Sequence, residues 1–202
     1  MLNSIFMKHK CDKSTHFYYE EYEKIFEPIR TKKLNILEVG IWKGLSLQAW
    51  YDYFPNATFY GLDIFSRIKP TEVPILQKDR VYYAECDSTN SEQVKKAMDK
   101  FNVTFDIIID DGLHNPLANL KTFENLISYL NDGGIYYVED AWPLDIMNQT
   151  EMNHSWLRKS QHLYNKENMD LFIKEISKYK VTRIDTRHKS KKPDSYMFRI
   201  EK

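Results

Sequence analysis

The sequence predicts an α/β fold in which the strands of an open, mostly parallel sheet alternate with helices. Apolar runs of strand length, such as residues 107–109, recur between longer amphipathic stretches. Acidic side chains follow directly after several of these runs, as Asp110 and Asp111 do here. Ligands of an open parallel sheet bind at the carboxyl ends of its strands. The pattern therefore predicts a functional site at that edge.

The same alternation justifies each element in turn. Strands are expected at residues 34–39, 58–63, 80–85, 105–110 and 134–139, with helices between them at 45–53, 91–101 and 117–130. The last of these helices is expected to end in the turn-forming residues 131–134. A helix at 165–179 then precedes extended runs at 181–187 and 196–200, which a short Lys/Pro/Asp loop would join as an antiparallel hairpin. Residues 1–33 are expected to form a helical N-terminal cap, and no linker or repeat divides the chain, so residues 1–202 are expected to be one domain.

Composition excludes several functional classes. Lys plus Arg (29) equals Asp plus Glu (29), so no global field favours nucleic acid or an acidic membrane. The basic run at 189–192 is interpreted as a solvated loop. No stretch reaches the roughly 20 apolar residues that a membrane span needs, and no signal peptide is recognised. Cys11 and Cys86 lack metal-site spacing, which favours a reducing, cytoplasmic location.

A glycine-containing loop joins the first strand to its helix. Glu38, Gly40 and Gly44 lie in this loop, where glycine permits a tight turn and close approach of a ligand. Asp63 ends the second strand, at the position of an acid that binds a ribose. Trp42 stands where a dinucleotide-binding loop would carry its middle glycine. A bulky residue there obstructs a pyrophosphate more than a cofactor without phosphates, such as S-adenosylmethionine.

The third strand is followed by Asp87 and Ser88. In this architecture their loop would lie near an adenine ring. A role in capping the next helix is the alternative at both positions.

A second group of side chains predicts a metal site. Asp111 follows the fourth strand, and Glu139 and Asp140 follow the fifth, so three carboxylates are expected to converge. Hard oxygen ligands favour Mg²⁺, with Mn²⁺ as the competitor, and the lack of thiolates argues against zinc. His114 is the candidate general base, since histidine titrates close to neutral pH. The alternatives are a simple turn at the aspartates and a helix-capping histidine.

Three motifs of the chain resemble those of a known family. LEVGIWKGLSLQAWYDYFPNATFYGLDI, FDIIIDDGLH and GGIYYVEDAW together resemble class I S-adenosylmethionine-dependent methyltransferases. Among these, the chain is most similar to the metal-dependent O-methyltransferases of macrolide sugars, the mycinamicin and macrocin type. The early Asp12-Lys13 with His16-Phe17-Tyr18 also resembles that group. Leu113 departs from its pattern, because a serine is usual there.

The resemblance implies a Rossmann-like, seven-stranded, mostly parallel sheet with an antiparallel last strand and helices on both faces. It also implies methyl transfer from S-adenosylmethionine to a hydroxyl. Carried over by position, the residues around the methionine end of the cofactor would be Glu38, Gly40 and Gly44, with Asp63 at the ribose and Asp87 and Ser88 at the adenine. Asp111, Glu139 and Asp140 would bind Mg²⁺, His114 would be the general base, and Asp110 would lie between cofactor and metal.

The sequence is also compatible with two other functions. One is a dinucleotide-dependent oxidoreductase on the same sheet, against which Trp42 argues. The other is a non-catalytic protein that binds S-adenosylmethionine. The expected partner is a small, polyhydroxylated, sugar-like acceptor, whose pocket residues 143–163 would shape. The aromatic N-terminal segment also suggests a homodimer, and no nucleic acid or membrane partner is expected.

Overall fold

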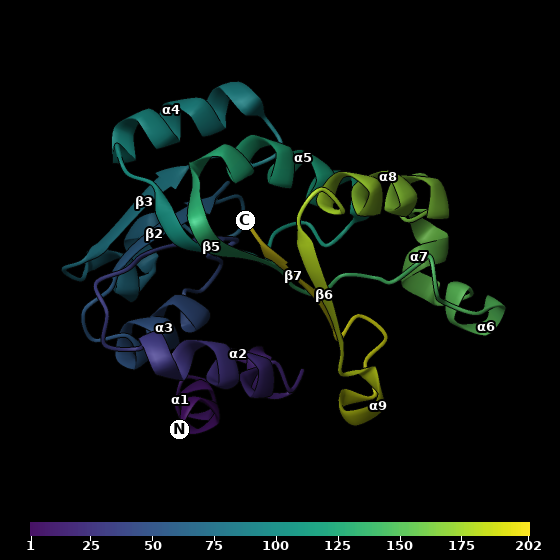
Figure 1. Cartoon of the computed structure of the whole chain (residues 1–202), viewed down its shortest axis with the longest axis horizontal. Helices are drawn as coiled ribbons and strands as arrows, with labels where there is room; N and C mark the ends of the chain where they lie inside the picture. The colour runs from purple at the N-terminus through teal and green to yellow at the C-terminus, as the bar shows by residue number, and fades with distance from the viewer.

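Seven strands form one sheet at the centre of the molecule, in the order β3-β2-β1-β4-β5-β7-β6 (Figure 1). The computed structural model describes residues 1–202. The strands are β1 (Asn35–Val39), β2 (Thr58–Asp63), β3 (Val81–Glu85), β4 (Phe105–Asp110), β5 (Leu130–Val138), β6 (Lys180–Asp185) and β7 (Tyr196–Glu201). Strands β1 to β5 pair in parallel, and β7 is antiparallel to both of its neighbours. This confirms the predicted fold class, including the antiparallel last strand.

Helices cover both faces of the sheet (Figure 1). One face carries α1 (Leu2–Lys8), α2 (Tyr19–Phe26) and α3 (Leu45–Tyr53), and the other carries α4 (Ser91–Phe101), α5 (Pro116–Leu126) and α8 (Lys166–Ile176). Three short helices, α6 (Gln149–Met152), α7 (Ser155–Lys159) and α9 (Arg187–Ser190), lie in the connections on the right of the view. None of the helices combines the length and the apolar composition that a membrane span requires.

Two cores result from the alternation of side chains along the strands. In β4, Ile108 packs into the core beneath α4, α5 and α8, whereas Ile107 and Ile109 pack into the core of the N-terminal helices. The second core is aromatic: Trp50 is fully buried and makes edge-to-face contacts with Phe6 and Tyr22. The N-terminal cap is therefore an integral layer of the fold, which places its residues against the carboxyl edge of the sheet.

The boundary between α5 and β5 differs from the expectation. The helix ends at Leu126, and the strand already begins at Leu130, so the predicted helix end at 131–134 is wrong. The backbone N–H of Gly133 donates to Lys202 (3.0 Å), and that of Lys202 donates to Gly134 (3.1 Å). Pairing with the distant end of the chain therefore holds the diglycine in the sheet.

Candidate active site at the carboxyl edge of the sheet

The central strands bring the predicted acidic residues to one place. The backbone N–H of Asp111 donates to the carbonyl of Val39 (2.9 Å), and that of Glu139 donates to the carbonyl of Asp110 (2.9 Å). These bonds join the ends of β1, β4 and β5 side by side. The carboxylates lie together because three neighbouring parallel strands end at the same edge.

Three side chains at this edge have the spacing of a cation site. Asp111, His114 and Asp140 each offer one ligand atom, and these atoms lie within 4.8 Å of one another. His114 Nε2 is 3.7 Å from Asp111 Oδ1. Both His114 (φ 54°) and Asp140 (φ 50°) have left-handed backbones, a conformation that costs a non-glycine residue about 1–3 kcal/mol. The fold thus holds these two side chains in place at a cost to its stability.

Glu139 is placed differently from the other predicted ligands. Its side chain is almost completely buried, and both of its carboxylate oxygens have partners in the protein. The Tyr22 hydroxyl donates to Oε1, and the Lys13 ammonium donates to Oε2. The structure therefore brings Glu139 beside the site but directs its oxygens toward the N-terminal cap.

The N-terminal cap also contacts the other two carboxylates. Lys13 Nζ donates to Asp111 Oδ2 (2.7 Å), and the Tyr18 hydroxyl donates to Asp140 Oδ1 (2.8 Å). His16 Nδ1 lies 3.1 Å from the same Asp140 oxygen and 2.9 Å from the Ser195 hydroxyl. His16 is itself buried.

The sequence predicts no role in the site for Lys13, Tyr18 and Tyr22. Lys13 and Tyr18 belong to the early segment that resembles the family. Their partners are 98 to 126 residues away in the sequence, so no local pattern indicates them.

The electrostatics of the site follow from burial and from these contacts. Burial would raise the pKa of Asp140, but the bonds from His16 and Tyr18 outweigh it and lower the pKa to about 2. Burial raises the pKa of Asp110 to about 7, although the neighbouring His114 opposes this. Burial favours neutral His114, but the neighbouring carboxylates, Asp111 first, outweigh burial and raise its pKa. Burial and these contacts thus shift the carboxyl pKa values at this edge in opposite directions.

The glycine loop approaches the same edge from β1. Gly40 has φ +89°, and a Cβ placed on it would lie 2.1 Å from the Asp111 carbonyl oxygen. Only glycine allows this contact, which joins the predicted cofactor loop to the predicted metal site. A Cβ placed on Gly44, which has φ +71°, would lie 2.5 Å from the Ile75 side chain and 2.7 Å from that of Val73.

The two acids of the predicted cofactor site have different surroundings. Glu38 is buried and accepts from the Ser46 hydroxyl through Oε1, while its Oε2 has no partner. Burial raises the pKa of Glu38 to about 7, although Lys13 opposes this. Asp63 ends β2 and accepts from the backbone N–H groups of Trp42 (2.8 Å) and Phe65 (2.7 Å). Asp63 thus orders the glycine loop.

The loop after β3 also has a defined structure. Asp87 Oδ1 accepts from the backbone N–H (2.9 Å) and hydroxyl (2.7 Å) of Thr89, and the Ser88 hydroxyl lies 2.9 Å from that of Thr122. The cap of α4 is Asn90, whose side chain accepts from two backbone N–H groups of that helix. Neither Asp87 nor Ser88 is therefore the helix cap that was the alternative.

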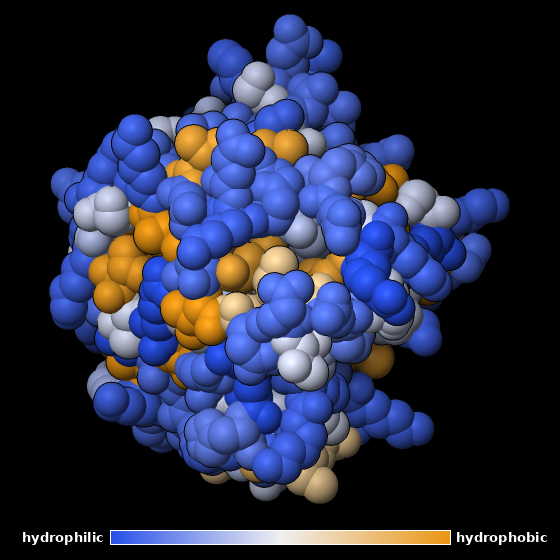
Figure 2. All heavy atoms as spheres, turned by 90° about the vertical axis from the view of Figure 1, so that its right-hand side faces the viewer, coloured by the Kyte–Doolittle hydropathy of each residue, from blue (hydrophilic) through white to orange (hydrophobic).

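The surface around the site exposes apolar side chains. The loops after β4 and β5 and helix α7 carry Leu113, Ile146 and Trp156, which are 57, 53 and 68% exposed. The face that bears α6, α7 and α9 shows apolar groups among hydrophilic ones (Figure 2). A ligand at this edge would therefore meet both polar and apolar surface.

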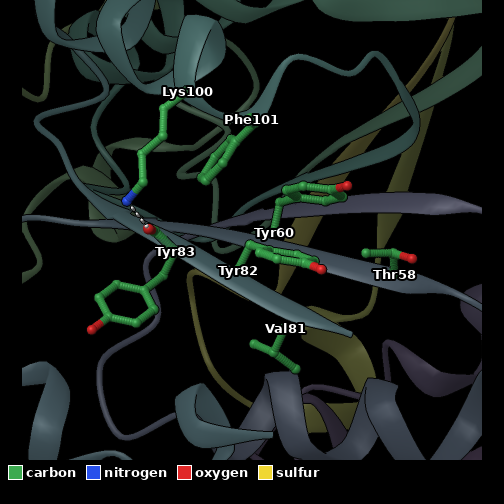
Figure 3. Close-up of a pocket in the computed structure, with 7 residues that line it drawn as sticks. All are labelled: Thr58, Tyr60, Val81, Tyr82, Tyr83, Lys100 and Phe101. Carbon is green, nitrogen blue, oxygen red and sulfur yellow. Dashed lines mark hydrogen bonds between the residues drawn. The ribbon is translucent and has the colours of Figure 1, made fainter. Parts of the chain in front are cut away.

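An open groove of about 630 Å³ lies elsewhere (Figure 3). It is lined by Thr58 and Val81, at the starts of β2 and β3, by the Tyr60 and Tyr82 rings and by Lys100 at the end of α4. The starts of parallel strands are at the opposite edge from the acidic cluster. This groove is therefore separate from the candidate active site.

Comparison with solved structures shows that the chain has the class I methyltransferase fold. MycE methyltransferase from the mycinamycin biosynthetic pathway, solved with Mg, SAH and mycinamycin VI, superposes with a TM-score of 0.71 at 21% identity over 100% of this chain and 53% of that one. The N-methyltransferase NodS from Bradyrhizobium japonicum gives a TM-score of 0.57 at 13% identity and covers 94% of this chain and 98% of that one. At these identities the likeness establishes the fold.

The curated proteins that this chain resembles in sequence are sugar O-methyltransferases. The chain is 29% identical over 134 residues to mycinamicin VI 2''-O-methyltransferase of Micromonospora griseorubida, covering 63% of this chain and 32% of the relative. It is 30% identical over 154 residues to 8-demethyl-8-alpha-L-rhamnosyl tetracenomycin-C 2'-O-methyltransferase of Streptomyces olivaceus, covering 70% and 39%. The matched region is thus about a third of each relative's length. No family model matches the chain.

Proposed function

We propose that this chain is an S-adenosylmethionine-dependent O-methyltransferase domain that uses a divalent cation, Mg²⁺ or Mn²⁺. The observation that carries the proposal is the grouping of Asp111, His114 and Asp140 within 4.8 Å, next to the glycine loop of β1. Similarity to the curated sugar O-methyltransferases supports the same activity.

The glycine loop fits the proposed cofactor. Gly40 and Gly44 have positive φ and lie against other protein atoms where a Cβ would stand, which gives the loop its tight turn, and Glu38 has one unpartnered oxygen. These three residues would surround the methionine end of S-adenosylmethionine. Asp63 would bind its ribose, and Asp87 and Ser88 would lie at its adenine. Asp110 would lie between the cofactor and the metal. Trp42, 49% exposed in the same loop, disfavours a dinucleotide pyrophosphate.

The donor set also fits a hard divalent cation. Asp111 Oδ1 and Asp140 supply carboxylate oxygens, which Mg²⁺ and Mn²⁺ prefer. His114 Nδ1 is buried without a hydrogen-bond partner, so no hydrogen bond within the protein occupies this nitrogen. Glu139 is the third proposed ligand, and in this structure its oxygens accept from Lys13 and Tyr22.

His114 is assigned the role of general base. When bound, S-adenosylmethionine supplies the methyl group, and a divalent cation lowers the pKa of an acceptor hydroxyl. His114 then accepts the hydroxyl proton as the carbon–oxygen bond forms. The carboxylates that raise its pKa are those that a divalent cation would neutralise, so the imidazole beside a loaded site is free to accept a proton.

The proposed acceptor is a small polyhydroxylated, sugar-like molecule. Two neighbouring hydroxyls would match the adjacent carboxylates, and the relatives are named for methylation of sugar hydroxyls. We further propose that residues 1–202 form one methyltransferase domain, that it acts in the cytoplasm, and that it assembles as a homodimer without a nucleic acid partner.

Methyl transfer from labelled S-adenosylmethionine to a panel of glycosylated and free sugar acceptors tests the activity, with Mg²⁺ or with EDTA. The proposal expects product with at least one acceptor and its loss in EDTA. Product that is unaffected by EDTA would contradict the metal requirement. Binding of NAD but not of S-adenosylmethionine would instead support an oxidoreductase.

A further inference from the structure

The connection between β6 and β7 carries a concentration of positive charge. We call residues 186–195 the basic hairpin, because they contain four lysine or arginine side chains and a single carboxylate, Asp194. The chain as a whole has a formal net charge of zero. The basic hairpin includes α9, which lies on the right of the view together with α6 and α7 (Figure 1). None of its side chains has a part in the proposed methyl transfer.

Two hydrogen bonds to the backbone place the basic hairpin against the candidate active site. The N–H of Ala141, the residue after Asp140, donates to the carbonyl of Tyr196 at 2.9 Å. The strand that leaves the hairpin therefore starts beside the end of β5. The Thr186 hydroxyl, at the other end of the hairpin, donates to the His16 carbonyl at 2.7 Å. Both ends of the hairpin are thus held at the carboxyl edge of the sheet.

Two cations of the basic hairpin are balanced by carboxylates. Arg187 donates to Asp185 (2.6 Å) and to Glu151 of α6 (3.0 Å). Lys189 forms an ion pair with Glu20 of α2. These contacts join the hairpin to the N-terminal cap on one side. On the other side they join it to the segment after β5 that is expected to shape the acceptor pocket, so the hairpin borders that pocket.

The other two cations, Lys191 and Lys192, form no ion pair. Lys191 is exposed, and its ammonium donates to the His188 carbonyl at 2.8 Å. Lys192 is half-buried, and its ammonium donates at 2.8 Å to the hydroxyl of Thr15, the residue before His16. An ammonium has three N–H donors, so each lysine retains donors for a further ligand. The basic hairpin thus presents two neighbouring, unbalanced positive charges next to the site.

A phosphate group matches these two charges. A phosphate monoester carries roughly −1.5 to −2 charge at neutral pH, and lysine binds phosphate oxygens through charge-assisted hydrogen bonds. A neutral sugar has no charge that would balance the two ammonium groups, and a single carboxylate would balance only one. The charge of the basic hairpin therefore favours an acceptor that carries phosphate.

We propose that Lys191 and Lys192 of the basic hairpin bind a phosphate group of the acceptor, which is then a sugar phosphate or a nucleoside diphosphate sugar. The inference rests on the proposed function and names the acceptor class of that site. If the two lysines are instead only solvated surface charges, their replacement will leave anion binding unchanged.

Calorimetric titration with inorganic pyrophosphate, at low ionic strength and in EDTA, tests the anion site without turnover. Wild type should bind pyrophosphate both with and without S-adenosylmethionine, because that cofactor has no phosphate and occupies the glycine loop. Lys191→Met combined with Lys192→Met should bind at least tenfold more weakly, since two charge-assisted hydrogen bonds are lost. Lys95→Met combined with Lys96→Met removes the same charge from α4 and should stay within about twofold of wild type.

Lys191→Gly separates loss of binding from loss of folding. Lys191 has a left-handed backbone (φ 61°) at the end of α9, a position where glycine is favoured. The variant should bind pyrophosphate about three- to tenfold more weakly while its Tm is no lower than that of wild type. Absence of pyrophosphate binding to wild type, or an equal loss in the α4 control, would overturn the inference.

Methyl transfer to matched acceptors distinguishes the two sources of phosphate. Each neutral sugar that accepts a methyl group is compared with its 1-phosphate and its uridine diphosphate derivative. The KM should be at least tenfold lower for one of the two phosphorylated forms, and the double lysine variant should lose this preference. A lower KM for the 1-phosphate indicates a sugar phosphate, and a still lower one for the uridine diphosphate form indicates a nucleoside diphosphate sugar. Equal KM values for all three forms would overturn the inference.

The two assays also separate this inference from the proposed function. If pyrophosphate binds through the two lysines but S-adenosylmethionine does not bind and no acceptor is methylated, the proposed function fails while the anion site stands. If neutral sugars are methylated and pyrophosphate does not bind, the proposed function stands and the inference fails.

Discussion

Replacing Gly40 with alanine should destabilise the protein and disturb the Asp111 side of the site. The left-handed backbone at φ +89° costs a non-glycine residue about 1–2 kcal/mol. The new Cβ would also lie 2.1 Å from the Asp111 carbonyl oxygen and 2.8 Å from its carbonyl carbon. Backbone atoms must therefore move, and overpacking of this kind typically adds about 1–3 kcal/mol. The expected loss in unfolding free energy is about 2–5 kcal/mol, measured by urea denaturation.

Gly133→Ala is the matched control. Gly133 also has a positive φ (+76°), but nothing lies within 4 Å of its Cβ position. It should cost only the backbone strain of about 1–2 kcal/mol and leave Mn²⁺ binding unchanged. If Gly40→Ala is no more destabilising than Gly133→Ala, or keeps wild-type affinity for Mn²⁺, the coupling of the glycine loop to Asp111 is refuted.

Three further predictions concern single side chains of the site. His114→Ala should lower kcat by about 10²–10⁴-fold. The Kd for S-adenosylmethionine, measured by calorimetry, should stay within about threefold of the wild-type value. A large loss of affinity would contradict the role of His114 as a base that acts only on the acceptor. Tyr22→Phe should cost about 1–3 kcal/mol of unfolding free energy, since buried Glu139 loses a donor, whereas Tyr82→Phe, on an exposed ring, should be neutral in the same denaturation series. Because the pKa of Asp110 is raised to about 7, its protonated form stabilises the fold at low pH, and this contribution is lost as the pH rises from about 4 through 7. Asp110→Asn should therefore gain stability relative to wild type between pH 5 and pH 8; a pH-independent difference would show that Asp110 is not buried in this way.

The fold was predictable wherever one local pattern was sufficient. The apolar run in β4 and the acidic residues that follow it identified the central strands and the edge at which they end. The start of β5 was not predictable, because Gly133 and Gly134 have the local chemistry of a helix end. Their place in the sheet depends on hydrogen bonds to Lys202, at the far end of the chain.

The site was predictable only in part, again because some of its contacts join segments that are far apart in the sequence. Asp111, His114 and Asp140 follow strands, so topology alone brings them together. The engagement of Glu139 by Lys13 and Tyr22 depends on how the N-terminal cap packs over the sheet edge. A buried lysine and a buried tyrosine in an amphipathic segment have no sequence signal that distinguishes them from surface residues.

Calorimetric titration of S-adenosylmethionine and its demethylated product, with Mg²⁺ and then with EDTA, is the direct test of the methyltransferase assignment. Both molecules should bind with micromolar affinity, and Mg²⁺ should give a separate heat of binding that Asp111→Asn and Asp140→Asn abolish. Failure of both molecules to bind would contradict the methyltransferase assignment.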